Sequence, residues 1–390
     1  MTTRPTIGSL CPAALLFLPL AASAAPDAAA LRAIVDNTIQ PLMAEHDVPG
    51  MAVAVTVDGQ SAVFNYGLAS RAGNKAVDER TVFEVGSVSK TFAATLAAYA
   101  QAQGKLALTD HPSRYWPALQ GSAIDKATLL HLGTYTPGGL PLQFPDELTD
   151  PEPLRYYRDW KPAARPGAVR EYSNPSLGLF GHLTARALGN DYADAVERLL
   201  FPAFGMTSSY VNLPDSVRPN YAWGYRDGKP VHFTGEPFSA VTYGVRTTAA
   251  DLLRFVQANM MPQQLDPAMR RAVEATHIGY FRVGGMTQGL GWEQYAYPVK
   301  LQTLLEGNSE SIIWDRHRAR AVTTPAMSTT PTLFNKTGST GGFGAYVAFV
   351  PVQKIGIVML ANKNYPIPAR VTAGYAILEA LAAGAQAAPQ

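Results

Sequence analysis

Cysteine is nearly absent from this chain: of its 390 residues only Cys11 carries a thiol, and it lies close to the N-terminus. A single thiol forms no intramolecular disulfide, so we expect the folded state to be stabilised by packing alone. Excess charge of one sign is also lacking, because 32 basic and 30 acidic residues leave a formal net charge of +2. This balance provides no strongly basic surface, and we expect no nucleic-acid partner.

Long hydrophobic runs are scarce as well. The apolar stretch at residues 11–20 (CPAALLFLPL) is too short for a permanent transmembrane helix. It follows a basic residue and precedes Ala-Ser-Ala at 22–24, the small-x-small pattern of a signal-peptidase site. A buried helix is the alternative, but Pro12 and Pro19 would interrupt it. We predict a signal peptide over residues 1–24, export to a bacterial periplasm and no stable membrane anchor after cleavage.

Motifs of two common hydrolase classes are missing. The 7 histidines are scattered and form no H-E-x-x-H pattern, which argues against a catalytic zinc. There is also no G-x-S-x-G motif, the nucleophile elbow of the α/β-hydrolases. We therefore expect no metal and no organic cofactor.

The periodicity of apolar residues predicts a mixed architecture. Strands near both ends of the chain flank a Pro- and Gly-rich, largely helical middle. The predicted fold class is α/β (α+β). Residues 25–105 and 221–390 form an antiparallel-sheet lobe flanked by N- and C-terminal helices, and residues 106–220 form an inserted, mostly helical lobe. The active site is expected at the junction, since clefts between lobes commonly bind small ligands. The predicted helices are 27–46, 87–103, 177–188, 251–260 and 371–381, and the predicted strands are 51–57, 62–66, 345–350 and 355–360.

Three short motifs carry the chemistry: Ser87-Val88-Ser89-Lys90, Tyr172-Ser173-Asn174 and Lys336-Thr337-Gly338. Each is weak alone, and S-x-x-K occurs by chance in roughly half of such chains. Tyr-x-Asn even occurs twice, the second time at residues 210–212. The first copy is preferred because Asn174-Pro175 is typical of an N-cap followed by proline at the first helical position. All three motifs, ordered and widely separated, indicate one site.

Ser87 and Lys90 are three residues apart on a predicted helix, so their side chains project from one face. If Ser87 begins that helix, its backbone N–H is an unpaired donor at the positive end of the helix dipole. A serine hydroxyl becomes a good nucleophile only when a base removes its proton. The motifs therefore predict a serine acyl-transfer enzyme that uses lysine and tyrosine as its proton-transfer groups.

The identity of the base stays open at this level. At pH 7 a free tyrosine is only about 0.1% ionised, and a free lysine is neutral about equally rarely. Lys90 and Lys336 near Tyr172 would favour its phenolate, whereas burial would favour neutral Lys90. We hypothesise that Tyr172 is the principal base in deacylation.

The three motifs and the segments around them resemble the class C β-lactamases, the AmpC-type cephalosporinases. The resemblance covers essentially the whole mature chain and implies a β-lactamase/transpeptidase-like fold. It is carried by VFEVGSVSKTFAATLAAYA, GGLPLQFP, EYSNPSLGLFGHL, QGLGWE, NKTGSTGGFGAYVAFVP and GIVMLANKNYP.

The resemblance implies that Ser87 is the acylated nucleophile, that Lys90 and Tyr172 share proton transfer, and that Lys336 orients Tyr172 and attracts the substrate carboxylate. The backbone N–H groups of Ser87 and Ser339 would form the oxyanion hole. The other residues implied to bind substrate are Gln143 and Tyr243 at the side-chain pocket, Asn174 against the acylamide and Lys90, Thr337 and Gly338 on the edge strand, and Asn364 and Arg370 near the carboxylate.

Two places depart from the family pattern. Ile367 stands where many relatives carry asparagine near the substrate carboxylate, so one polar contact is expected to be absent. Ser239 and Val241 stand where relatives often carry acidic residues. Glu293 is either a surface acid or a residue near the site, and no catalytic role is assigned to it.

The expected function is hydrolysis of the β-lactam amide bond of cephalosporins and penicillins through a Ser87 acyl-enzyme, by a monomer. A D,D-peptidase or a lactamase-like esterase would use the same residues, although Lys336-Thr337-Gly338 favours the lactamase. An alternative of another class is a penicillin-binding sensor that is acylated and does not deacylate.

Overall fold

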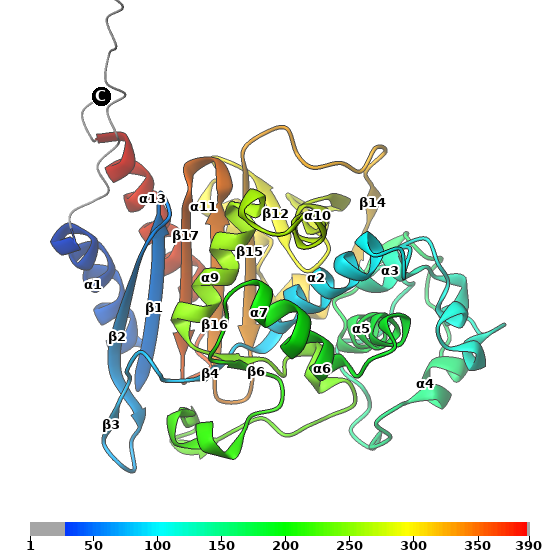
Figure 1. Ribbon diagram of the computed structural model, residues 1–390, viewed down its shortest axis with the longest axis horizontal. Helices are drawn as coiled ribbons and strands as arrows, with labels where there is room; N and C mark the ends of the chain where they lie inside the picture. The colour runs from blue at the N-terminus through cyan, green and yellow to red at the C-terminus, as the bar shows by residue number, and fades with distance from the viewer. Residues whose placement is uncertain (1–27, 388–390) are drawn as a thin grey trace, which may run out of the picture.

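The computed structural model describes residues 28–387, so the predicted signal peptide lies outside the described residues. Its centre is a 10-stranded sheet in the order β14-β10-β11-β12-β15-β16-β17-β1-β2-β3, with antiparallel pairing throughout (Figure 1). The predicted α/β fold class with an antiparallel sheet is confirmed. The strands are β1 Gly50–Val57, β2 Gln60–Ser70, β3 Lys75–Ala76, β10 Gly279–Val283, β11 Met286–Gly289, β12 Glu293–Ala296, β14 Arg320–Ala321, β15 Thr332–Ser339, β16 Gly344–Val350 and β17 Ile355–Ala361.

Helices cover both faces of this sheet, which explains why its central strands are almost continuously apolar. Along β1, Val53 and Val55 pack with α1 (Ala28–Glu45) and α13 (Ile367–Ala387) on one face. Ala52 and Ala54 face the other layer, which contains α2 (Ser89–Ala102), α5 (Asn174–Leu188), α9 (Ala249–Met260) and α10 (Pro267–Thr276). In Figure 1, α1 and α13 lie on one side of the strands, and α9 and α2 lie on the other.

The first and last thirds of the chain meet in the middle of the sheet. β1 pairs with β17, so that Met51 stands opposite Ala361. The fully buried Asn362 connects this pair to other segments. Its Oδ1 accepts a hydrogen bond from the Gly50 N–H 312 residues away, and its Nδ2 donates to the carbonyls of Leu68 and Trp223.

The chain between the sheet segments supplies a mostly helical region beside α2 and α5 (Figure 1). α2 is apolar on nearly every side because it packs in the interior, and Gly104 follows its end with φ +69°. The remaining helices are α3 Leu129–Gly133, α4 Leu154–Asp159, α6 Tyr192–Ala195, α7 Phe201–Ala203, α8 Ser239–Thr242, α11 Leu301–Glu306 and α12 Glu310–Trp314, and the short strands are β4 Phe83–Glu84, β5 Val169–Arg170, β6 Ser209–Tyr210, β7 Gly224–Arg226, β8 Lys229–Val231, β9 Arg246–Thr247 and β13 His317–Arg318.

The predicted N-cap of α5 is wrong by one residue. Ser173, with φ −149° and ψ 121°, is the N-cap, and its hydroxyl accepts a hydrogen bond from the Ser176 N–H at 3.0 Å. Asn174 is already the first helical residue, and Pro175 follows it. The shift frees the Asn174 side chain from capping, and it turns toward Gln143 instead.

We expect Ser173→Ala to lower the free energy of unfolding by about 1 kcal/mol, because a donor at the start of α5 loses its acceptor. Urea unfolding followed by circular dichroism measures the change. Thr248→Ala is the matched comparison, since Thr248 caps α9 in the same way, through the Asp251 N–H at 3.2 Å. Unchanged stability of Ser173→Ala beside a destabilised Thr248→Ala would contradict the assigned cap.

Candidate active site

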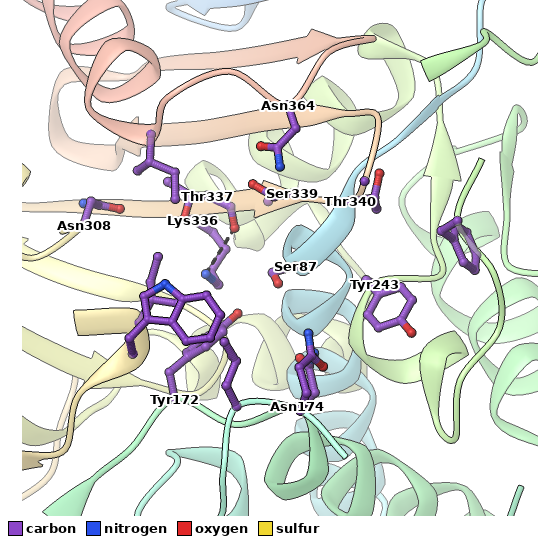
Figure 2. Close-up of a pocket in the computed structure, with 18 of the residues that line it drawn as sticks. Ser87, Tyr172, Asn174, Tyr243, Asn308, Lys336, Thr337, Ser339, Thr340 and Asn364 are labelled. Atoms are coloured by element: carbon purple, nitrogen blue, oxygen red, sulfur yellow. Dashed lines mark hydrogen bonds between the residues drawn. The ribbon is translucent and has the colours of Figure 1, made fainter. Parts of the chain in front are cut away.

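A cavity of about 880 Å³ opens where the end of β15, the start of α2 and the loop before α5 meet. In Figure 2, Lys336 points from β15 toward Tyr172, and Ser87 lies between this pair and Tyr243. Lys90 and Arg370 are the predicted site residues that do not line it. Those that do are Ser87, Gln143, Tyr172, Asn174, Tyr243, Lys336, Thr337, Gly338, Ser339 and Asn364.

Ser87 lies in a single 3₁₀ turn, Gly86–Val88, directly before α2. One turn further, the fully buried Lys90 donates hydrogen bonds from Nζ to Ser87 Oγ at 2.8 Å and to the Thr242 carbonyl at 2.9 Å. Burial disfavours the ammonium ion and lowers the pKa of Lys90 to about 8. At pH 7 about a tenth of such lysines are neutral, roughly three hundred times the fraction for a free lysine.

Tyr172 lies in the loop before α5 and is only 6% exposed. Lys90 Nζ and Lys336 Nζ each lie 5.1 Å from the centroid of its ring. Burial raises the pKa of Tyr172, but the positive charges of Lys336 and Lys90 outweigh it and lower that pKa to about 8. Within residues 28–387, the buried Tyr172 oxygen makes no hydrogen bond of good geometry, and its phenolate form can take a proton from an incoming group.

Lys336 carries the second cation of the site. Its Nζ lies 3.5 Å from Glu293 Oε1 and donates to the Thr337 carbonyl at 3.2 Å. Burial lowers the pKa of Lys336, but the negative charges of Glu293 and the Tyr172 phenolate overcome that effect and raise the pKa overall. Lys336 therefore stays protonated in the pH range in which Lys90 and Tyr172 titrate.

The strand β15 packs backbone to backbone against the turn that carries Ser87. Gly86 has φ +52°, and a Cβ there would lie 2.6 Å from the Ser339 carbonyl oxygen. A Cβ on Gly338 would lie 3.1 Å from Ser87 N and closer still to the Val85 carbonyl. The two glycines thus place the backbones of Ser87 and Ser339 side by side, as an oxyanion hole requires.

Opposite β15, Asn174 and Gln143 form one rim of the cavity, with Asn174 Nδ2 donating to Gln143 Oε1 at 2.7 Å. The ring of Tyr243 packs edge to face against Phe233, with ring centroids 5.5 Å apart. The expected contact between Asn174 and Lys90 is not a hydrogen bond in the described part of the chain: Lys90 donates to Ser87 and Thr242.

At the other end of the cavity, Asn364 is exposed and Ile367 contributes an apolar wall. Arg370 was expected close to a substrate carboxylate, but its guanidinium is fully buried behind the wall. It donates to the Gly338 carbonyl at 2.7 Å, to Ser339 Oγ at 2.9 Å and to Asn364 Oδ1 at 2.5 Å. Arg370 therefore braces the end of β15 and does not itself face the cavity.

Sequence reasoning missed Arg170, Asn308 and Trp314, and it left open whether Glu293 lies at the surface or near the site. Arg170 and Glu293 are buried charges on its floor, and Asn308 and Trp314 lie at the side reached by α12. Trp314 is 67% exposed. The sequence gives only weak signs that these residues belong to a site. Glu293 is a lone acid among apolar residues in GLGWEQYAY, and Trp314 is a lone aromatic residue in a polar stretch.

No helix in residues 28–387 is both long and apolar enough to cross a membrane. The same residues contain no group of three or more histidine, cysteine, aspartate or glutamate side chains placed to hold a metal ion.

Comparisons with known proteins agree on one family. The family model described as beta-lactamase matches residues 35–382. A beta-lactamase of Pseudomonas fluorescens is 49% identical over 353 residues, which cover 90% of this chain and 99% of the relative. The crystal structure of a D-alanine carboxypeptidase AmpC from Burkholderia cenocepacia has a TM-score of 0.87 at 50% identity, covering 90% of this chain and 99% of that one. A class C beta-lactamase in complex with cefoxitin has a TM-score of 0.87 at 48% identity, with the same coverage.

Gly86→Ala should lower kcat/KM by about 100-fold, because the added methyl group separates the turn of Ser87 from β15 and removes a donor from the expected oxyanion hole. A chromogenic cephalosporin, the substrate class expected from the sequence, provides the assay. Gly73→Ala is the control, since a Cβ at Gly73 would have no atom within 4 Å. Equal activity of the two variants would show that the close approach is not needed.

Tyr172 should ionise well before an ordinary tyrosine. We expect near-ultraviolet absorbance to show one phenolate forming at about pH 8. This step should be missing in Tyr172→Phe, and it should move to higher pH in Lys336→Ala, because the phenolate loses a neighbouring cation. Identical titration curves for the wild type and Tyr172→Phe would contradict the lowered pKa.

Proposed function

The chain belongs to the β-lactamase family, and on that premise we propose that it hydrolyses the β-lactam amide bond of cephalosporins and penicillins through an acyl-enzyme on Ser87. The observation that carries the proposal is the hydrogen bond from the buried Lys90 Nζ to Ser87 Oγ at 2.8 Å, beside Tyr172. A hydroxyl in contact with two groups of lowered pKa is an activated nucleophile.

In the acylation step, Ser87 Oγ attacks the carbonyl carbon of the lactam ring. The proton of the hydroxyl passes to the Tyr172–Lys90 pair, and the negative charge that develops on the carbonyl oxygen is met by the backbone N–H groups of Ser87 and Ser339. The ring C–N bond then breaks, and its nitrogen takes up the proton. This leaves an ester on Ser87 and an opened ring.

In the deacylation step, a water molecule attacks the ester carbonyl and gives its proton to Tyr172, which is the principal base. The ester C–O bond breaks, and Ser87 Oγ recovers that proton through the same pair. Lys336 remains a cation throughout, so it stabilises the Tyr172 phenolate and attracts the substrate carboxylate.

The remaining residues orient the substrate. The substrate lies along the edge of β15 formed by Thr337, Gly338 and Ser339. Its acylamide side chain binds to Asn174 and Gln143, and Tyr243 forms the wall of that pocket. At the carboxylate end, Asn364 is the polar contact beside Ile367. Arg370 is a positioning residue there, because it acts through Ser339 and Asn364.

The proposal includes the setting of the enzyme. Residues 1–24 are a signal peptide, and the mature chain acts in the periplasm as a monomer without a membrane anchor or cofactor. Its sheet lobe (25–105 and 221–390) and its helical lobe (106–220) close on a small-molecule β-lactam. Export is supported by the sequence pattern at residues 11–24.

With a chromogenic cephalosporin, the purified mature chain should show sustained multiple turnover, and Ser87→Ala should lower kcat/KM by more than about 1000-fold because it lacks the nucleophile. Ser328→Ala, in the exposed segment before β15, is the matched serine control and should retain activity. A single stoichiometric burst without further turnover would instead indicate the non-deacylating sensor. Cleavage of D-alanyl-D-alanine peptides alone would indicate the peptidase.

A further inference from the structure

Two charged side chains on the floor of the cavity have no part in the proposed chemistry. Glu293 on β12 has a side chain only 5% exposed, and Arg170 on β5 is fully buried. Arg170 Nη2 lies 3.7 Å from Glu293 Oε1. Buried charges are costly even when they are paired, and replacing such a pair by apolar residues is often neutral for stability. Fold stability is therefore a weak explanation for this pair.

The contacts of Arg170 hold it in one place. Its Nε donates to Gln288 Oε1 on β11 at 3.0 Å, and its Nη1 donates to the Ile312 carbonyl on α12 at 2.7 Å. A guanidinium fixed at two points presents its remaining nitrogen in one direction. That nitrogen, Nη2, is the one that faces Glu293.

Glu293 in turn contacts the proposed machinery. Its Oε1 lies 3.5 Å from Lys336 Nζ, on the strand that neighbours β12. The carboxylate thus stands between the fixed Arg170 and Lys336, and it draws the Lys336 ammonium to a set position beside the ring of Tyr172.

More positive than negative charges surround Tyr172. Arg170 Cζ lies 5.5 Å from the centroid of the Tyr172 ring, close to the 5.1 Å of Lys90 Nζ and Lys336 Nζ. Among the residues that face Tyr172, Glu293 carries the negative charge, and this charge opposes the three cations. The titratable and charged groups that face Tyr172 or Glu293 are Lys90 on α2, Tyr135 after α3, Arg170 on β5, Tyr295 on β12, Lys336 on β15 and Tyr346 on β16.

We propose that Glu293 and Arg170 form a positioning pair for the catalytic base: Glu293 holds Lys336 beside Tyr172 and offsets part of the surrounding positive charge, and Arg170 fixes Glu293. The proposal rests on the role of Tyr172 as the base in the proposed function. It assigns the pair control over the pH range in which the enzyme works.

The two members of the pair act on Tyr172 with opposite sign. Without the Glu293 carboxylate, three cations surround Tyr172 unopposed, so its phenolate forms at lower pH. Without the Arg170 guanidinium, one cation is lost and the phenolate forms at higher pH. Arg170 Cζ lies 5.5 Å from the centre of the Tyr172 ring, and a charge within about 4–6 Å of a titratable group shifts its pKa by about one unit or more.

The test compares pH profiles of kcat/KM for a cephalosporin. Relative to the wild type, the acid limb should move down by about one pH unit in Glu293→Gln and up by about one unit in Arg170→Gln. Glu293→Asp keeps the charge, so its limb should stay in place although kcat/KM falls. Phenolate absorbance of Tyr172 should shift in the same directions, and it requires only folded protein.

Asp251→Asn is the matched control, because it removes another buried carboxylate, paired with Arg254 outside the cavity. It should lower stability and leave the acid limb unmoved. An unmoved limb in either Glu293→Gln or Arg170→Gln, whichever folds, overturns the positioning pair. That result leaves the proposed function intact, because the function is tested separately by the multiple turnover of the wild type and its loss in Ser87→Ala.

Discussion

The site depends on the contact between two pieces of backbone, the turn at Gly86 and the end of β15 at Gly338. Neither position has room for a Cβ atom, so the two segments touch directly. This contact joins the N-terminal end of α2 to the edge of the sheet. It places Ser87, Lys90 and Lys336 in one small volume although they come from distant parts of the chain. The Arg370 guanidinium supports it from behind by holding Gly338 and Ser339.

Within that volume, burial and charge act against each other. Burial alone would keep both Tyr172 and Lys90 neutral. Three cations near Tyr172 favour its phenolate, and the phenolate in turn favours the Lys90 ammonium. The outcome is two groups whose pKa values both lie at about 8. A proton can therefore move between them at little cost, which suits the proposed steps in which it is first taken from Ser87 and later returned.

Sequence reasoning was strong where chemistry depends on residue type and spacing. Three motifs predicted a common site, and the structure brings Ser87, Tyr172 and Lys336 to one cavity. It was weaker where the outcome depends on tertiary packing. Nothing in the sequence shows that the Thr242 carbonyl would accept a hydrogen bond from Lys90, or that Arg170 would be buried beside Glu293.

The N-cap of α5 shows the limit at short range. Serine and asparagine are about equally good N-caps, so the sequence Ser173-Asn174-Pro175 permits either start of the helix. The tertiary contact between Asn174 and Gln143 uses the asparagine elsewhere. The burial of Arg370 has a related cause, since an arginine next to this end of the cavity can donate to backbone carbonyls behind the wall.

The pairing of β1 with β17 also determines when the chain can fold. The centre of the sheet, and the buried Asn362 that closes it, need residues 312 positions apart. Contacts of such long range form slowly, and here they cannot form at all until the last tenth of the chain has been synthesised. A nascent chain of this protein therefore cannot complete the centre of its sheet until almost all of its residues have been made. The proposed export fits this strand order, because the sheet stays incomplete until most of the chain has been made.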